Sequence, residues 1–588
     1  MSPDSATTPP VRRLPLTGVL RVGRPSDIWF KPALSVIAAV APPCLTLAAL
    51  DRLDLAMYAM AGALCALYAH NRPYAARSRV LAGVVLGMLA GLAVALVAAS
   101  LTGNAVVLVT VGALLAAVQK TLCDATCIGP PANVVLTFVS SAALFAPQTL
   151  GQVPGHLALA AGAGCWAWLV GMAPGLVRPH GPERRATAHA LNTVAAHIEA
   201  HGSGDGIGGH GYVRSRVAAE AAVQTARQTL SSAGGRPGTA RATTRRALQR
   251  LVVRAELALA ESRPDELRAW ALELRVGGQI PTPGGHLAGE PHDVELAAPP
   301  KPLWTRLGPL APFAARTALG CALAGYASLA LGIGRPYWAL VTAASLYQAN
   351  VTLTWNRAVQ RTVGNLAGVL LFAAVVPLAH LGPVALVLCC LALNFGAEAL
   401  MSRNYWLGSV CVTPMALLVT EFTGFQEPGR LMTERIVDTC VGALLGFVAA
   451  VAVTNHRAGV RVEHALTAVE HARTHAERAL TDVHPVPERL DEARRGLAAA
   501  LSDLHTTADT AAGEWWQRTR PQERVVLAER SGHRTLAATA RGQELRTQGL
   551  SSHSRLPGGA MHALSPHRAQ THVQPVRGPA PGTPRART

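Results

Sequence analysis

A small set of charged residues stands inside otherwise apolar stretches in the second half of the chain. Its members are Arg316, which stands at the start of a span, and Arg361, Glu398, Glu421, Arg435 and Asp438. Ionisable groups at membrane depth are costly, and they commonly mark a substrate or ion pathway. An arginine in such a place attracts an anion, and a carboxylate in low dielectric can hold a proton near neutral pH. These residues are therefore our candidates for anion binding (Arg361, Arg435) and for proton coupling (Asp438, Glu398, Glu421).

Two arginines have a structural interpretation beside the functional one. Arg435 and Asp438 lie three residues apart on one helix face, so they either form an ion pair that anchors a helix end or face a common cavity. Arg361, like Arg79, stands where a loop enters an apolar run. Such an arginine either anchors the helix by reaching lipid headgroups or binds an anion at the inner mouth of a pathway.

Aromatic residues offer a second kind of candidate. Tyr337 and Trp338 begin an apolar run, so they are either interfacial anchors or a surface on which an aromatic ligand stacks. With Arg361, Arg435 and Arg79 they complete the predicted substrate-binding set.

Catalytic and metal-binding patterns are absent from the sequence. It contains no P-loop, no zinc-protease helix and no nucleophile elbow. All ten cysteines fall in or beside apolar runs, and no histidine cluster accompanies Cys123 and Cys127. We therefore expect no enzyme activity, no metal and no cofactor.

Composition favours a polytopic membrane protein. Of 588 residues, 50% are hydrophobic and only 15% are charged, and the mean hydropathy is +0.25. The net charge of +18 is concentrated in the polar segments. Because the positive-inside rule already places such segments in the cytoplasm, we expect a lipid bilayer and no nucleic acid as partner.

Apolar runs of bilayer-spanning character occur six times in each half. The predicted spans are 32–50, 53–69, 80–100, 103–122, 132–148 and 156–177, then 309–331, 336–349, 362–379, 382–400, 404–420 and 434–454. The predicted fold is therefore all-α: a polytopic membrane protein with two six-helix modules, each followed by a cytoplasmic helical region.

The two halves predict an internal repeat in the same orientation. Tyr58 and Tyr68 match Tyr337 and Tyr347 in spacing. Arg79 is followed by glycines at 83 and 87, as Arg361 is followed by glycines at 364 and 368. Because six spans return the chain to its starting side, the copies form a parallel repeat with both termini cytoplasmic.

Polar segments divide the remainder of the chain. The predicted units are a cytoplasmic tail (1–30), membrane module 1 (31–178), a cytoplasmic helical linker domain (179–307), membrane module 2 (308–455), a cytoplasmic C-terminal helical region (456–547) and a disordered basic tail (548–588). The linker helices are expected at 183–200, 211–233, 239–261 and 264–276, and the C-terminal ones at 461–483, 486–511 and 521–540.

The second module resembles the fusaric acid resistance (FUSC) family, which includes the aromatic acid exporters. The resemblance rests on Tyr337-Trp338-Ala339-Leu340-x-Thr342, on Arg357-x-x-x-Arg361-x-x-Gly364-x-x-x-Gly368, on Asn404-Tyr405 with Val412-Thr413-Pro414, and on Glu434-Arg435-Ile436-Val437-Asp438-Thr439-x-x-Gly442. It covers about 309–455. Over 31–178 it is looser, because the first copy lacks the Arg-x-x-x-Arg spacing.

The resemblance implies an integral membrane protein that exports small organic, often aromatic, acids. The Ala- and Arg-rich composition suggests a bacterial cytoplasmic membrane, and we expect secondary transport. Plant malate channels look similar in module architecture, so a passive organic-anion channel stays open. A third alternative is a membrane scaffold whose cytoplasmic helices bind a partner without transport. An adaptor protein and a homo-oligomer are further partners that the resemblance leaves open.

Overall fold

The computed structural model of the chain describes residues 16, 18–23, 28–202, 210–233, 239–258, 264–281, 302–453, 458–482, 487–512 and 524–539 except 537. Throughout this part of the chain every regular element is a helix. The all-α prediction is confirmed.

The first half forms an apolar group of helices followed by a polar group. The apolar elements are α1 (Phe30–Ala49), η1 (Leu53–Leu55), α2 (Ala56–Ala63), η2 (Leu64–Leu67), α3 (Tyr74–Leu101), α4 (Ala105–Ala125), α5 (Asn133–Leu144), η3 (Leu150–Gln152), α6 (Val153–Met172) and α7 (Pro174–Val177). The polar helices are α8 (Gly181–Gly202), α9 (His210–Ser232), α10 (Ala240–Ala258) and α11 (Pro264–Val276).

The second half follows the same order. Its apolar elements are α12 (Leu303–Leu307), η4 (Gly308–Leu310), α13 (Ala311–Ala330), α14 (Tyr337–Leu346), α15 (Val351–Ala379), α16 (Pro383–Met401), α17 (Tyr405–Thr420), η5 (Glu421–Thr423) and α18 (Pro428–Ala452). The polar helices α19 (Ala458–Thr481) and α20 (Pro487–Ala512) come next, and a further helix begins at residue 524.

Nine helices among the described residues are long and apolar enough to cross a membrane. Three further apolar segments, Leu53–Leu67, Asn133–Leu144 and Tyr337–Leu346, are shorter. A helix rises about 1.5 Å per residue, so these three do not reach across a hydrocarbon core of about 30 Å. The predicted spans at 53–69, 132–148 and 336–349 are therefore incomplete as helices. Two of them end in a tyrosine with extended backbone, Tyr68 and Tyr347.

The third helix of each half begins earlier than its apolar run. The structure starts α3 at Tyr74 and α15 at Val351, where the sequence predicts starts at 80 and 362. Asn350 caps α15 by accepting a 2.8 Å hydrogen bond from the backbone N–H of Leu353. Because helical geometry continues through the polar residues after this cap, Arg361 lies inside a helix and not at the end of a loop.

Corresponding helices pack together in both halves. The second helix contacts the sixth in each half (α2 with α6, α14 with α18), and the third contacts the fifth (α3 with α5, α15 with α17). Across the halves, α1 packs on α16 and α13 packs on α4. This exchange of first and fourth helices is consistent with the predicted parallel repeat, which itself stays a prediction.

The glycine pairs of the two halves differ in their surroundings. A Cβ atom at Gly364 would lie 2.6 Å from the carbonyl oxygen of Trp406, and one at Gly368 would lie 2.8 Å from that of Val410. These glycines therefore allow α17 to approach α15 closely. Gly83 and Gly87 meet no neighbour within 4 Å, so the sequence match between the pairs does not extend to packing.

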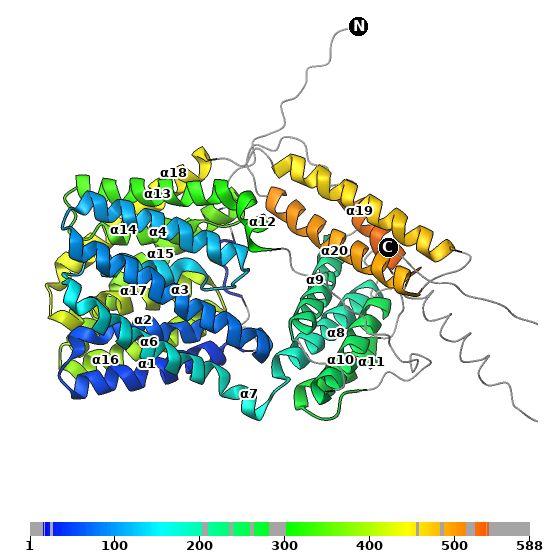
Figure 1. Cartoon of the computed structure of the whole chain (residues 1–588), viewed down its shortest axis with the longest axis horizontal. Coiled ribbons are helices and arrows are strands. Elements are labelled where there is room, and N and C mark those ends of the chain that lie inside the picture. The colour runs from blue at the N-terminus through cyan, green and yellow to red at the C-terminus, as the bar shows by residue number, and fades with distance from the viewer. Residues whose placement is uncertain are drawn as a thin grey trace, which may run out of the picture.

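The polar helices lie together at one end of the membrane part (Figure 1). Helices α8–α11 share one hydrophobic core, and α19, α20 and the helix after 524 share another. We call this end of the membrane part the inner end and the opposite one the outer end. The predicted polar helices agree with α8–α11, α19 and α20. The tail from 548 lies outside the described residues, as does most of 1–30.

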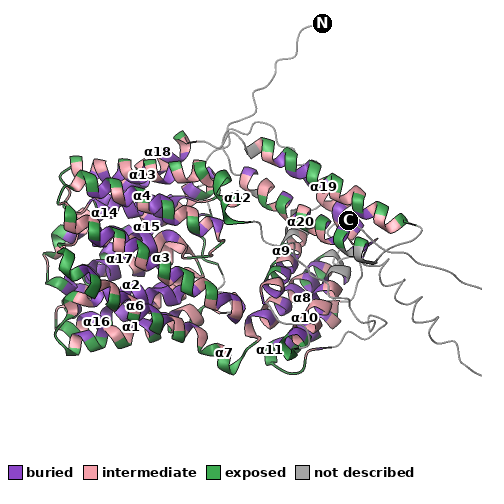
Figure 2. Cartoon of the chain, in the orientation of Figure 1, coloured by how far each residue is buried: buried purple, intermediate pink, exposed green. Residues whose placement is uncertain are grey.

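Burial separates the interior of the membrane part from its surface (Figure 2). A large core joins small and aliphatic residues of both halves. On the outward faces of the long helices leucines are exposed, for example Leu86, Leu114 and Leu370. Such an apolar outer surface is expected where lipid, not water, surrounds the helices.

Candidate functional site

A cavity of about 2140 Å³ lies between the two halves of the membrane part and extends at the inner end to the polar helices α8, α9, α11, α19 and α20. The short helices α2, α5 and α14 contribute to its wall together with α17. Residues from both ends of the membrane part line it, from Asp54 and Gln148 at the outer end to His70 and Arg72 at the inner end. The incomplete spans thus surround the cavity, where irregular backbone is tolerated at membrane depth.

The cavity wall carries an excess of positive charge. Among the described residues its lining includes nine arginines and lysines but three acids. The basic residues are Arg72, Lys120, Arg185, Arg275, Arg335, Arg357, Arg361, Arg435 and Arg461, and the acids are Asp54, Asp124 and Glu398. A low-dielectric cleft of one sign concentrates ions of the opposite sign, so this cavity favours anions.

Arg361 projects from α15 and is 4% exposed. Its Nη1 donates a 2.7 Å hydrogen bond to the hydroxyl of Tyr405, the first residue of α17. Arg357, one turn earlier, places its Cζ atom 3.8 Å from the centre of the same tyrosine ring. The Nε of Arg361 has no hydrogen-bond partner. A buried guanidinium with a free N–H is suited to an anionic ligand.

Arg435 forms a second cationic position on α18. It is 1% exposed, and its Cζ lies 4.1 Å from the ring centre of Trp338, an ordinary cation–π distance. Its Nε and Nη1 have no hydrogen-bond partner. Arg435 and Arg361 lie within electrostatic range of each other, so one anion between them would relieve their mutual repulsion.

Aromatic rings surround this position. Tyr337 stacks on Trp338 with ring centres 4.9 Å apart. The ring centre of Phe138 of α5 lies 5.8 Å from that of Trp338, and the ring centre of Phe145, directly after α5, lies 5.9 Å from that of Tyr337. Both predicted aromatic residues are buried and line the cavity, so they pack inside the protein and do not face lipid as an interfacial anchor would.

The three predicted carboxylates lie in different places. Glu398 lines the cavity. Asp438 is fully buried, and its Oδ1 accepts a 2.6 Å hydrogen bond from Ser328. Glu421 is also buried, and its Oε2 lies 3.1 Å from the Nε2 of His380. Neither Asp438 nor Glu421 is among the cavity-lining residues.

Arg435 and Asp438 share a helix without forming an ion pair. Of the ion pairs between described residues, none joins these two side chains. Arg435 faces the cavity, whereas Asp438 turns to Ser328 on α13. Arg435 and Asp438, three residues apart on α18, therefore make two separate contacts.

Arg79 lies away from the cavity. Its side chain is exposed on α3, and its Nε lies 3.4 Å from the backbone oxygen of Ala75. Two residues earlier, Arg77 is buried and lies 3.2 Å from the Nδ1 of His70. The structure thus separates Arg79 from Arg361 and Arg435, with which the sequence groups it.

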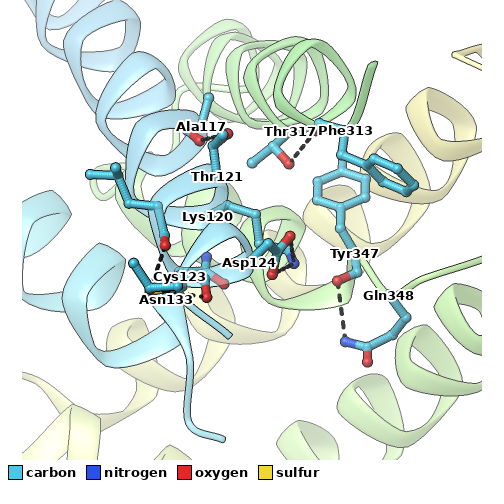
Figure 3. A network of polar contacts seen from close by, with 12 residues as sticks. Ala117, Lys120, Thr121, Cys123, Asp124, Asn133, Phe313, Thr317, Tyr347 and Gln348 are labelled. Atoms are coloured by element: carbon cyan, nitrogen blue, oxygen red, sulfur yellow. Dashed lines mark hydrogen bonds and ion pairs between the residues drawn. The ribbon is translucent and has the colours of Figure 1, made fainter. Parts of the chain in front are cut away.

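An ion pair stands near the inner end of the cavity (Figure 3). On α4, Lys120 donates to both carboxylate oxygens of Asp124, at 2.5 and 2.7 Å. Both residues line the cavity, as do Tyr347 and Gln348 after α14. At the outer end Arg335 donates to Gln426 and lies 3.6 Å from Glu434.

A segment near the N-terminus, residues 18–23, crosses the start of α17; we call it the N-terminal strap. Side chains of Gln360, Asn404 and Trp406 donate hydrogen bonds of 2.9 to 3.2 Å to its backbone carbonyl oxygens. Gln360 precedes Arg361, and the other two residues flank Tyr405. The strap therefore holds together the backbone positions from which the Arg361–Tyr405 contact is made.

Several cavity residues have no signal in the sequence that separates them from packing residues. They include Tyr58, Gln148 and His156; Tyr405, by contrast, is marked by the Asn404-Tyr405 part of the family resemblance. Tyr58 is marked only by its match to Tyr337 in the predicted repeat, and His156 is one of 21 histidines. No local sequence pattern indicates that Gln148 contacts Tyr58, because 90 residues separate them.

Residues 322–449 match the model of the family described as fusaric acid resistance protein-like. The resemblance is confirmed over this segment. It contains Tyr337, Trp338, Arg361, Glu398 and Arg435, so the family match covers the part of the cavity that carries the buried arginines. The first half of the chain lies outside it.

Part of the chain is also similar to a bacterial membrane protein. The chain is 35% identical over 123 residues to the uncharacterized membrane protein YvaC of Bacillus subtilis (strain 168). The matched part is 21% of this chain and spans about a fifth (19%) of the relative's length. No solved structure matches the chain.

Proposed function

We propose that this protein is a membrane transporter that exports small organic anions, aromatic carboxylates among them, through the cavity between its two halves. One observation carries the proposal. Arg361 and Arg435 present guanidinium N–H groups without hydrogen-bond partners beside the buried rings of Trp338 and Tyr337 and the half-buried ring of Tyr405. Guanidinium groups suit a carboxylate, and the rings suit an aromatic body.

The family match supports the same class of function. The proposal places the protein in a bacterial cytoplasmic membrane with its polar helices in the cytoplasm. Both polar groups lie at one end of the membrane part, as that topology requires (Figure 1), and basic segments favour the cytoplasmic side. A homo-oligomer and an adaptor protein stay predictions.

The proposal assigns the coupling proton to Glu398. Of the three acids that line the cavity among described residues, Asp54 pairs with Arg52 and Asp124 pairs with Lys120. Glu398 has no such ion pair in the described part of the chain. A carboxylate that faces the cavity and lacks a fixed cation can exchange a proton as anions pass.

Flux of a labelled aromatic acid into and out of proteoliposomes tests the proposal. Each buried arginine offers a carboxylate a charge-assisted hydrogen bond worth about 1.5–3 kcal/mol. We therefore expect Arg435→Gln and Arg361→Gln each to weaken apparent affinity about ten- to a hundredfold. Arg79→Gln, an equal charge change outside the cavity, is the matched control and should behave as the wild type.

The Glu398→Gln variant tests proton coupling separately from the passage of the anion. We expect it to abolish accumulation driven by a proton gradient while downhill flux of the anion continues. Large single-channel currents in the wild type without proton coupling would instead support a passive anion channel. A wild-type protein that inserts but moves no anion, or arginine variants with unchanged flux, would refute the proposal.

A further inference from the structure

The outer end of the cavity contains a second polar position, formed only by the first half. His156, near the start of α6, stacks on Tyr58 of α2 with ring centres 3.9 Å apart and planes 10° apart. Gln148 donates a hydrogen bond to the Tyr58 hydroxyl. All three residues line the cavity. We refer to them as the His156 niche.

Two polar atoms in this niche are buried without a hydrogen-bond partner: the Nδ1 of His156 and the Oε1 of Gln148. Desolvated polar atoms are costly when they stay unpaired. A protonated Nδ1 of His156 donates a hydrogen bond, so an anion completes it, whereas the Oε1 of Gln148 only accepts and does not hold a carboxylate. Stacking on Tyr58 fixes the imidazole plane, which leaves Nδ1 in a constant direction.

The niche resembles the arrangement around Arg435 in the helices that form it, although the predicted repeat matches Tyr58 to Tyr337 and not to Trp338. In the second half, Arg435 of the sixth apolar helix, α18, lies over the ring of Trp338. Trp338 belongs to the first turn of the short second helix, α14. In the first half, His156 of α6 lies over Tyr58 in the first turn of α2. The pairs α2–α6 and α14–α18 pack in the same way. One difference matters: arginine is always charged, whereas histidine is charged only when protonated.

We propose that the His156 niche is a second, outer binding site for the carboxylate group of an organic anion, and that it is filled only when His156 is protonated. This inference deepens the proposed function and rests on it. Anions held at Arg361 and Arg435 bind at any pH near neutrality, and the niche adds a second position when the outer solution is acidic. An acidic exterior would then slow release of the exported anion.

Charged groups around the niche are few. Asp54 and Arg52, hydrogen-bonded to each other, lie within electrostatic range of His156. The helices α1 and α3, which pack against α6, carry Lys31 and Arg77 at the opposite end. Tyr74 and Arg79 of α3 lie at that opposite end as well. The other titratable residues of α1, α2 and η2 are Cys44, Tyr58 and Cys65. A proton on His156 therefore changes the charge of the niche.

Equilibrium binding of labelled benzoate to the full-length protein in detergent, at about pH 8 and about pH 5.5, tests the inference. The wild type is expected to bind one benzoate per chain at the higher pH and two at the lower. His156→Gln should bind one at both values, with the acid-dependent affinity reduced at least about tenfold. His156→Arg, which carries a permanent charge, should bind two at both values.

Two further variants separate this inference from the proposed function. Arg435→Gln should weaken the pH-independent site and leave the acid-dependent one. His380→Gln, a histidine at the outer end that does not line the cavity, should leave both sites as in the wild type. A wild type that binds one benzoate at both pH values, or a second site that persists in His156→Gln, would overturn the inference alone. Absence of benzoate binding at both pH values would overturn the proposed function as well.

Discussion

Replacement of Gly364 by alanine tests whether the close approach of α15 and α17 holds the cationic site together. A Cβ atom at this position would lie 2.6 Å from the Trp406 carbonyl oxygen and 2.6 Å from the Ser409 Cβ. Heavy atoms do not approach a Cβ closer than about 3.0 Å, so α17 must retreat by about 0.4 Å or more. Both contacts lie on α17 close to Tyr405.

The energetic expectation combines two opposite effects. Overpacking in a well-packed interior costs about 1–3 kcal/mol, whereas alanine in place of glycine in a helix gains about 1 kcal/mol. We expect Gly364→Ala to be destabilised by up to about 2 kcal/mol and to lose the 2.7 Å contact between Arg361 and Tyr405. Because that contact orients the guanidinium, anion affinity should fall with stability.

Gly83→Ala is the matched control, because it occupies the corresponding place in the other half and meets no neighbour within 4 Å. The assay heats detergent extracts of both variants and measures the protein that still elutes as a single species on size-exclusion chromatography. We expect a lower melting temperature for Gly364→Ala and an unchanged or higher one for Gly83→Ala. Equal melting temperatures would refute the packing argument.

Three other predictions concern the inner end. Asn404→Ala removes an amide that donates to two strap carbonyls, so trypsin should cleave after Arg21 faster than in the wild type. Burial, reinforced by the Arg77 guanidinium, lowers the pKa of His70 to about 3; the unfolded chain therefore binds the extra proton first, and the melting temperature should fall as pH drops below about 6.5, less so in His70→Asn. Cys127, exposed and lining the cavity, should react with an impermeant maleimide only from the cytoplasmic side.

Helix content and order could be predicted because they depend on local patterns. The long apolar runs had to be helices, since each backbone N–H and C=O needs a partner within its own segment in lipid. The family pattern likewise pointed to Tyr337, Trp338, Arg361 and Arg435, all of which line the cavity. Helix starts were predicted less well, because α15 continues through polar residues that hydropathy assigns to a loop.

Grouping of the charged residues could not be predicted. The sequence grouped Arg79 with Arg361 in one substrate-binding set, yet the Arg79 side chain is exposed on α3. It also led us to expect that Arg435 and Asp438 either form an ion pair or face a common cavity, whereas the fold turns Arg435 to the cavity and Asp438 to Ser328. A residue's direction around a helix depends on which neighbours pack against that helix, and hydropathy does not contain this information.

By itself, the sequence determined that the protein is a helical membrane protein with buried arginines in its second half, because apolar length and charge placement are properties of single segments. Only the tertiary structure decided which arginines meet in one cavity, that Tyr405 and the N-terminal strap position Arg361, and that His156 stacks on Tyr58. Those relations join segments from different helices and from both halves. They exist only once the incomplete helices have packed around a common space.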